Sequence, residues 1–357
     1  MRVGLVLTVV GLALIGALLH PLAFLLGLMP FDTQGLINVF SEAKTLIADL
    51  LAWALVTLLG LMLFFVLRGR AKARKPKGSR PLRQFQREPA RRTVVGIIAY
   101  NEAEAIYDLV RDFKSQDDVI EVIVVDNNST DSTAQLAASA GARVVAERRQ
   151  GYGWACIRAL QEGALTPGAE VVALAEGDGT FDPADLAKFQ SYIGQADMVV
   201  GTRVVNGLVE DGSQMDYFFT WGNMAVGTLL RFRFWNAQFL GTARLTDVGC
   251  TYRVIRRDAL ARILPDLVIG GHHFSPHMLL VALSRRLSVI EIPVTFRRRL
   301  GVSKGAGASF RKGFAVGLLM IWHILAYTPR VRAGQATAPE LLPVANEVGV
   351  EISHAGR

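Results

Sequence analysis

Short apolar runs alternate with segments of helical spacing between residues 93 and 200, and this alternation constrains the fold most strongly. The apolar runs that we expect to form strands lie at 93–99, 119–125, 143–146, 171–175 and 198–200. The segments with helical spacing lie at 102–114, 131–140, 154–164 and 185–193. Strands that alternate with helices form mainly parallel sheets with helices on both faces. The sequence therefore predicts an α/β fold with a doubly wound, mainly parallel sheet.

Two long apolar segments precede the predicted sheet. Residues 3–28 contain no Asp, Glu, Lys or Arg, and residues 46–67 contain only Asp49. Each segment is long enough to cross the hydrocarbon core of a bilayer, which is about 30 Å thick. We therefore predict a transmembrane hairpin of two helices within residues 1–67. Two buried helices of a soluble protein are the less favoured alternative.

Basic residues are concentrated directly after the second apolar segment. Residues 68–92 contain eleven Lys or Arg and one acid, Glu88, so this linker accounts for the net charge of +8 on the chain. A basic stretch beside a span marks the cytoplasmic side and favours anionic lipid headgroups, so we predict no nucleic-acid partner. The prediction is a multi-pass protein of the cell (inner) membrane with a cytoplasmic catalytic domain. Cys156 and Cys250 would be free thiols there, since the cytoplasm is reducing.

The most informative short motif is Glu176-Gly177-Asp178, which directly follows the apolar run 171–175. Ligands of open α/β sheets bind beyond the carboxyl ends of the strands. Oxygen ligands at such an edge suit Mg²⁺ or Mn²⁺, which take one or two carboxylates together with substrate phosphates. An acidic turn without a ligand is the alternative, because Asp and Gly dominate turns.

Polar residues also follow the first two predicted strands. Tyr100 and Glu102 follow the first strand, and Asp126 begins a polar run after the second. Helix capping would explain Asn101 or Ser129 singly, but the strand ends of a doubly wound sheet line one crevice. Tyr100 is suited to lie against a nucleobase, and the carboxylates are suited to accept hydrogen bonds from a base or a ribose.

Aromatic and basic residues are interleaved in the C-terminal half of the chain. The segment 202–247 equally suits a bilayer interface and an ordinary pair of packed helices. Residues 313–327 are uncharged, mostly apolar and too short to span a bilayer, so we predict a membrane-interfacial helix within 309–332. The polar tail, 333–357, is predicted to be disordered.

Taken together, the motifs resemble those of a known family. The resemblance rests on the order and spacing of YNE at 100–102, VVDNNSTDST at 124–133, GYGWA at 151–155, the acid-x-acid turn, GTR at 201–203, LTDVGCTYR at 245–253 and RLGVSKG at 299–305. The set resembles inverting family-2-type glycosyltransferases with the GT-A fold, and within them the dolichyl- or polyprenyl-phosphate sugar synthases. This resemblance implies a GT-A catalytic domain at 93–308, a nucleotide sugar as donor and a polyprenyl phosphate as acceptor.

The resemblance also implies roles for individual residues. Asp178 would be the main ligand of Mg²⁺ or Mn²⁺, with Glu176 and Thr180 beside it. The nucleotide sugar would be bound by Tyr100, Glu102, Val124, Asp126, Glu176, Gly177, Asp178, Arg299 (or Arg298) and Lys304. The catalytic set would be Asp178, Arg203, Asp247 and Arg253. In that set, Arg203 would contact phosphate, while Asp247 and Arg253 would shape the sugar and acceptor end.

The chain departs from the family pattern at a few positions. Glu176 replaces the usual first Asp, and Thr180 stands where relatives often have Gln. His277 occupies a place where many relatives carry Glu, and a structural role is the favoured interpretation of a lone His there. The predicted spans are N-terminal, whereas many relatives have them at the C-terminus or lack them.

The chemistry that the resemblance implies needs few bases. A phosphate monoester has a second pKa near 6, so a polyprenyl phosphate is its own nucleophile at neutral pH. We predict a membrane-anchored inverting glycosyltransferase that transfers a sugar from a UDP- or GDP-linked donor to a polyprenyl phosphate at the cytoplasmic face. The alternatives are transfer to another lipid or glycan acceptor, and a non-catalytic membrane scaffold with a sugar-nucleotide fold. The oligomeric state is not predicted.

Overall fold

The computed structural model describes residues 91–213, 217–234, 244–301 and 310–329, together with five residues between 52 and 60. All elements named below belong to one compact unit that comprises residues 76–233 and 241–357. Apart from those five residues, the predicted hairpin lies outside the described residues, as do most of the basic linker, the tail and Lys304. Within the described ranges, no helix combines the length and the apolar character that a membrane span requires.

A seven-stranded sheet forms the centre of this unit, with the strand order β3-β2-β1-β4-β6-β5-β7. The strands are β1 (Thr93–Ala99), β2 (Val119–Asp126), β3 (Arg143–Ala146), β4 (Val171–Glu176), β5 (Met198–Thr202), β6 (Arg253–Arg256) and β7 (Val289–Pro293). All neighbouring strands are parallel except β6, which is antiparallel to both β4 and β5. The predicted mainly parallel sheet is confirmed. Neither β6 nor β7 was predicted from the sequence. In β6, only two apolar residues stand between the terminal arginines, which is too short a run to mark a strand.

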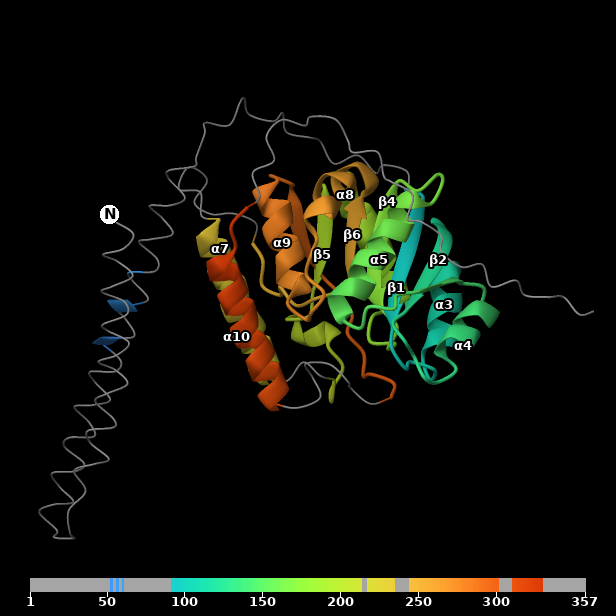
Figure 1. Cartoon of the computed structure of the whole chain (residues 1–357), viewed down its shortest axis with the longest axis horizontal. Helices are drawn as coiled ribbons and strands as arrows, with labels where there is room; N and C mark the ends of the chain where they lie inside the picture. Colours follow the sequence, from blue (N-terminus) through green and yellow to red (C-terminus); the bar gives the residue numbers. More distant parts are fainter. Residues whose placement is uncertain are drawn as a thin grey trace, which may run out of the picture. The chain divides into compact units, whose positions relative to one another are not determined.

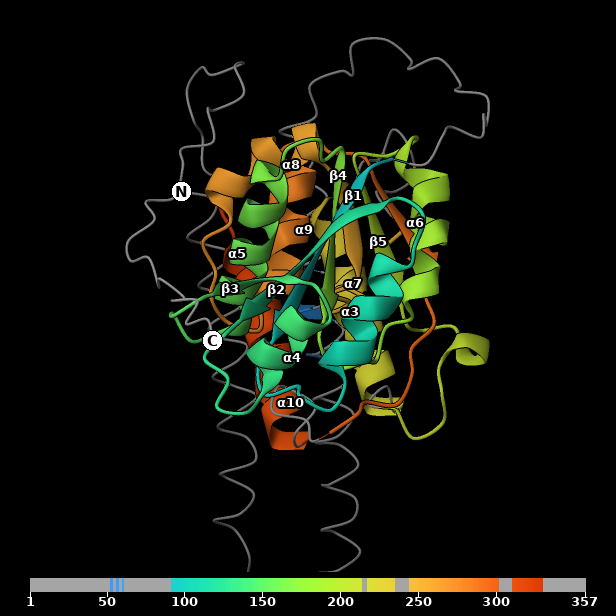
Figure 2. The same cartoon turned by 90° about the vertical axis from the view of Figure 1, so that its right-hand side faces the viewer.

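Helices cover both faces of the sheet (Figure 2). One layer contains α3 (Ile106–Lys114), α4 (Thr133–Ser139) and α6 (Leu186–Ile193), and the other contains α5 (Tyr152–Leu165), α8 (Arg257–Ile263) and α9 (Phe274–Ser284). On β1, alternate residues face opposite layers. Ile97 lies in the core with Phe113 of α3, whereas a Cβ atom at Gly96 would come within 2.9 Å of Ala159 in α5. The predicted doubly wound arrangement is therefore confirmed.

Two further helices, α7 (Tyr217–Arg233) and α10 (Phe310–Ala326), pack along each other, and α10 also contacts α9 (Figure 1). Of the described residues in segment 202–247, only α7 forms an α-helix and its partner α10 lies outside the segment, so both interpretations of this segment stay predictions. A helix is present inside the segment 309–332, as expected, and its position at a membrane interface stays a prediction.

The carboxyl ends of β1, β2 and β4 meet at one edge of the sheet. Ile98 is paired with Glu176 in the register of β1 and β4, and Ala99 is paired with Asp126 in that of β1 and β2. The predicted crevice therefore brings these strand ends together. The N-caps of α3 and α4 are Ala105 and Ser132, so helix capping does not account for the polar residues that end the strands.

Asn101 and Ser129 join the two strand-end loops to each other. The backbone N–H of Asn101 donates to the Oγ of Ser129 at 2.9 Å, and the N–H of Thr130 donates to the Oδ1 of Asn101 at 2.7 Å. Asn101 adopts a φ of 54°, a left-handed conformation that Asn tolerates better than most residues. These bonds hold Tyr100 and Glu102 at the sheet edge.

Candidate active site

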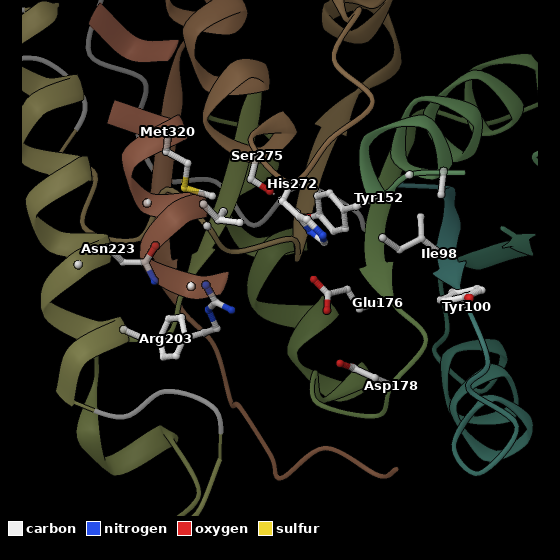
Figure 3. Close-up of a pocket in the computed structure, with 18 of the residues that line it drawn as sticks. Ile98, Tyr100, Tyr152, Glu176, Asp178, Arg203, Asn223, His272, Ser275 and Met320 are labelled. Carbon is white, nitrogen blue, oxygen red and sulfur yellow. Dashed lines mark hydrogen bonds between the residues drawn. The ribbon is translucent and has the colours of Figure 1, made fainter. Parts of the chain in front are cut away.

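A cavity of about 560 Å³ opens at this edge of the sheet (Figure 3). The predicted site residues that line it are Tyr100, Glu102, Glu176, Gly177, Asp178, Arg203 and Arg299. The predicted residues that do not belong to its lining are Val124, Asp126, Thr180, Asp247 and Arg253. The structure thus brings together the strand-end carboxylates and two of the predicted arginines.

Asp178 lies at the end of β4 and is only 3% exposed. Its Oδ1 accepts hydrogen bonds from the N–H of Thr180 at 3.1 Å and from the Thr180 hydroxyl at 2.6 Å. Its Oδ2 accepts a hydrogen bond from Nη1 of Arg299 at 2.8 Å. Gly179 supports the turn between them, because its φ of +75° is strained for other residues. These three hydrogen bonds hold the carboxylate in one orientation, and Thr180 supplies two of them.

Glu176 lies at the end of a chain of buried hydroxyl groups. The Thr251 hydroxyl donates to its Oε1, and the Tyr152 hydroxyl lies 2.5 Å from that of Thr251 and 2.9 Å from that of Ser275. Burial, followed by the charge of Asp178, raises the pKa of Glu176 to about 7. Near neutral pH this carboxyl group can therefore exchange a proton.

Arg299 bridges two strand ends. Besides Asp178, its guanidinium binds Glu102 after β1, and its side chain is 12% exposed. Its Nε is buried and has no hydrogen-bond partner within the part of the chain that the structure describes. Arg298 is exposed, and its backbone N–H donates to Glu210. Of the two arginines that the sequence left open, Arg299 is therefore the one that lies in the site.

Arg203 forms a two-bond ion pair with Asp247. Its Nε lies 2.7 Å from Oδ2 of Asp247 and its Nη2 lies 2.9 Å from Oδ1. Burial acts to lower the pKa of Arg203, but the charge of Asp247 outweighs it and raises that pKa. Burial likewise acts to raise the pKa of Asp247, and Arg203 lowers it overall. Arg203 therefore stays positively charged at any pH at which the protein is folded. Figure 3 shows its guanidinium across the cavity from Glu176.

Three of the predicted site residues outside the cavity lining are held by contacts within the fold. Arg253 is 2% exposed, and its guanidinium donates to the backbone carbonyls of Val248, Cys250 and Ser275 at 2.7–2.9 Å. Val124 is fully buried in the core. Asp126 accepts hydrogen bonds from the backbone N–H of Ser129. The binding roles of these three residues stay predictions, as does the role of Asp247.

The oxygen donors at the end of β4 fit a divalent cation that shares its coordination with a substrate. Among the described residues, no group of three or more His, Cys, Asp or Glu side chains is placed to hold a metal ion. Asp178 and Glu176 offer carboxylate oxygens and Thr180 a hydroxyl, all of which suit Mg²⁺ or Mn²⁺. Such ions are commonly held by one or two carboxylates when phosphates supply further ligands. The site therefore fits a metal–diphosphate pair better than a metal alone.

Sequence reasoning missed several residues of the site. Tyr152 and Thr251 lie in the motifs GYGWA and LTDVGCTYR, but no role was assigned to them. Asn223 of α7 and His272, which precedes α9, also line the cavity. No local pattern marks these two residues, because the packing of distant segments brings them to the site.

The contacts of His277 support the structural role that the sequence analysis favoured for this residue. It is 4% exposed, and its Nδ1 lies 3.0 Å from Nε2 of His323 in α10. Its Nε2 lies 3.0 Å from the carbonyl oxygen of Asp266. These contacts join α9 to α10, and His277 is not among the residues that line the cavity.

Comparison with known proteins assigns the chain to a family. The family model described as Glycosyl transferase family 2 matches residues 94–264. An uncharacterized glycosyltransferase of Mycobacterium tuberculosis is 32% identical over 207 residues, which are 57% of this chain and 85% of that protein. The chain belongs to glycosyltransferase family 2. The resemblance inferred from the motifs is thereby confirmed, and so is the prediction that the protein is a glycosyltransferase.

Other relatives of this family 2 glycosyltransferase carry more specific names. A polyprenol monophosphomannose synthase of Mycolicibacterium smegmatis is 28% identical and covers 68% of this chain and 91% of its own length. A dolichyl-phosphate hexose transferase of Haloferax volcanii is 31% identical and covers 57% of this chain and 82% of its own length.

A comparison with solved structures also finds a similar protein. Glucosyl-3-phosphoglycerate synthase of Mycobacterium tuberculosis, solved with Mn²⁺ and UDP-glucose, is 18% identical, with a TM-score of 0.49. The match covers 66% of this chain and 78% of that chain.

Proposed function

We propose that this family 2 glycosyltransferase transfers a sugar, with inversion, from a UDP- or GDP-linked nucleotide sugar to a polyprenyl phosphate. The observation that carries the proposal is one cavity that is lined by two carboxylates at the end of β4, Glu176 and Asp178, and by two arginines, Arg203 and Arg299. The acceptor class is supported by the names of the two relatives that act on polyprenol and dolichyl phosphate.

The donor half of the reaction needs negative charge to be stabilised. The bond between the anomeric carbon and the diphosphate breaks, and its electron pair leaves with the nucleoside diphosphate. A bound Mg²⁺ or Mn²⁺ would supply charge neutralisation for this leaving group. Asp178 and Glu176 would hold the ion, and Thr180 would keep Asp178 oriented. Arg299, whose side chain already lies beside Asp178, would contribute a fixed cation to the same diphosphate.

The acceptor half of the reaction needs a nucleophile on the opposite face of the sugar. A phosphate monoester is largely dianionic at pH 7, so its oxygen attacks the anomeric carbon without a proton being removed. The permanent cation Arg203 would hold that phosphate through charge-assisted hydrogen bonds. Attack opposite the leaving diphosphate inverts the anomeric configuration.

The proposal includes anchoring in the cell membrane, with the catalytic domain on the cytoplasmic side. It is supported by the apolar segments 3–28 and 46–67 and by the basic linker 68–92. The full-length chain should stay in the membrane pellet after an alkaline carbonate wash. Its release into the supernatant by that wash would contradict integral anchoring.

Substitution of Asp178 tests the catalytic part of the proposal. Asp178→Ala should lower both donor hydrolysis and transfer by about 100-fold or more. The reason is that the metal ion that neutralises the diphosphate would lose its main protein ligand. Asp182→Ala is the matched control, since Asp182 lies four positions further on, pairs with Arg297 and is outside the cavity lining. Full activity of Asp178→Ala would overturn the assignment.

Transfer to a hydroxyl group of another lipid or of a glycan is a second candidate. It is favoured by the raised pKa of Glu176, because a hydroxyl nucleophile needs a base that is active near pH 7. Glu176→Gln separates the two functions. Loss of transfer with unchanged donor affinity, measured by calorimetry with UDP- and GDP-sugars and Mn²⁺, would favour the hydroxyl acceptor. Loss of donor affinity together with transfer would favour the phosphate, because Glu176 then acts by holding the metal ion of the donor site.

A further inference from the structure

The cavity continues beyond the carboxylates into a groove between α7 and α10. We call this part the α7–α10 groove, and its lining includes Gly222, Val226, Gly313, Gly317, Met320 and Ile321. The four residues of α10 in this set recur at helical spacing, so they share one face of that helix. The groove is apolar, in contrast to the half of the cavity at the end of β4.

Two glycines of the groove border empty space. A Cβ atom built at Gly222 or at Gly317 would meet no atom of the described residues within 4 Å. Gly227 of α7 behaves differently, because its Cβ atom would come within 2.9 Å of the carbonyl oxygen of Leu245. Gly227 therefore allows a close approach of protein backbone, whereas Gly222 and Gly317 border room that no atom in the described ranges fills.

Polar side chains lie where the groove meets the carboxylate half. Arg203 and Asn223 lie together in Figure 3, across the cavity from Glu176. A Cβ atom at Gly249 would come within 2.8 Å of Oδ1 of Asn223 and 3.3 Å of Nη2 of Arg203. Gly249 therefore lets both side chains lie close to its backbone. A cation and an amide at this junction suit a phosphate group.

The groove is open to the exterior along α10. Phe314 and Leu318 line the cavity and are 50% and 51% exposed. Trp322 follows at helical spacing and is 68% exposed, and Trp221 of α7 is 55% exposed. Large apolar side chains exposed on both helices favour contact with hydrocarbon. An apolar chain could therefore pass from a bilayer into the groove without crossing water.

We propose that the α7–α10 groove binds the hydrocarbon chain of the acceptor lipid, whose phosphate is held by Arg203 and Asn223. This inference rests on the proposed function and deepens it, because it assigns the acceptor a site distinct from that of the nucleotide. The continuity of the groove with the carboxylate half gives the acceptor phosphate access to the donor sugar. Contact with the apolar groove selects acceptors by their chain, and contact with Arg203 selects them by their headgroup.

Filling the groove tests the proposal in the full-length enzyme. Gly222→Leu and Gly317→Leu place a side chain in empty space on a helix, and Leu is a better helix former than Gly, so the fold should be kept. The KM for a long-chain polyprenyl phosphate should rise about 10- to 100-fold, as burial of part of the chain is lost. The KM for the nucleotide sugar and donor hydrolysis without acceptor should not change. Ala315→Leu is the matched control, because Ala315 is exposed on α10 and outside the cavity lining.

The headgroup part of the proposal has its own variant. Asn223→Ala should raise the KM for long-chain polyprenyl phosphate and for geranyl phosphate alike, by about 10-fold, since one hydrogen bond to a charged group is lost. The leucine variants should impair the long-chain acceptor more than geranyl phosphate.

The outcomes separate this proposal from the proposed function. Wild-type kinetics for the lipid in both leucine variants, or an equal rise in the KM for donor and acceptor, would overturn the groove assignment and leave the function standing. If the wild-type enzyme transfers sugar to no polyprenyl phosphate, the proposed function fails and the groove assignment fails with it.

Discussion

The guanidinium of Arg299 lies 2.8 Å from a carboxylate oxygen of Asp178, although the two residues are 121 positions apart in the sequence. The same guanidinium also binds Glu102. A nucleoside diphosphate would require both the cation and the carboxylate that this pair now joins. Donor binding is therefore expected to exchange the carboxylate partners of Arg299 for phosphate oxygens.

Removal of the Arg299 side chain should slow the reaction of the nucleotide sugar. Arg299→Ala should lower kcat/KM for the nucleotide sugar by about 100-fold, because the leaving diphosphate loses a fixed cation. Arg298→Ala is the matched control and should change kcat/KM little, since Arg298 is exposed. Steady-state kinetics with varied donor measure both effects. Equal losses in the two variants would contradict the placement of Arg299.

Breaking the buried pair of Arg203 and Asp247 should destabilise the protein. Asp247→Ala leaves a buried guanidinium without its anion, which costs about 3–5 kcal/mol in comparable cases. The Tm of the full-length protein should fall by roughly 5–10 °C. Asp258→Ala should leave Tm nearly unchanged, because the side chain of Asp258, which pairs with Arg256, is 64% exposed. Thermal unfolding followed by circular dichroism tests this, and an unchanged Tm in Asp247→Ala would refute it.

The hydroxyl of Thr251 should matter for the orientation of Glu176. Thr251→Val keeps the shape of the side chain but removes the hydrogen bond to the buried carboxylate. Activity should fall by about 10-fold, in line with the loss of one hydrogen bond to a charged group. Thr251→Ser restores the hydroxyl and should recover most of the activity. The account is contradicted if Val and Ser variants are equally impaired.

The docking of α10 should depend on pH through His323. Burial, followed by His277, His273 and Arg233, lowers the pKa of His323 to about 4. An unfolded chain binds that proton near pH 6.5, so the stability that neutral His323 contributes is complete above pH 6.5. It is lost progressively as the pH falls toward 4.

The Tm of the wild-type protein should therefore fall more steeply between pH 7 and pH 4 than the Tm of His323→Phe. The Phe variant keeps a ring for contact with Tyr327 but does not titrate. Tm measured across this pH range in both proteins provides the comparison. Parallel pH dependences would show that His323 does not link protonation to stability.

The sequence was a good guide to the sheet but a weaker guide to helix ends. The runs at β1 and β4 are short and buried over nearly their whole length. Such runs are typical of strands in a parallel sheet that is covered on both faces. The helix expected at 102–114 begins instead at Ile106. The N–H of Glu102 donates to the hydroxyl of Thr133, 31 residues away, and this tertiary contact holds Glu102 at the sheet edge. Periodicity contains no information about such a bond.

The residues of the candidate site could likewise be predicted only in part from the sequence. The carboxylates of Glu102, Glu176 and Asp178 could be predicted to meet, because parallel strands place their carboxyl ends at one edge. The contribution of Asn223 could not be predicted, since it depends on how α7 packs against the sheet edge. The Ser275–Tyr152–Thr251 chain also needed the structure, because its three hydroxyl groups come from separate segments.

Sugar transfer to a lipid phosphate is the central claim, and a donor screen tests it most directly. Membranes that contain the full-length protein would be incubated with each labelled UDP- or GDP-sugar, long-chain polyprenyl phosphate and Mg²⁺ or Mn²⁺. We predict that one donor transfers its label to the organic extract, that the label is released by mild acid, and that chelation of the divalent cation abolishes the transfer. Label that stays in the aqueous phase with every donor, although a nucleotide sugar binds, would contradict the account.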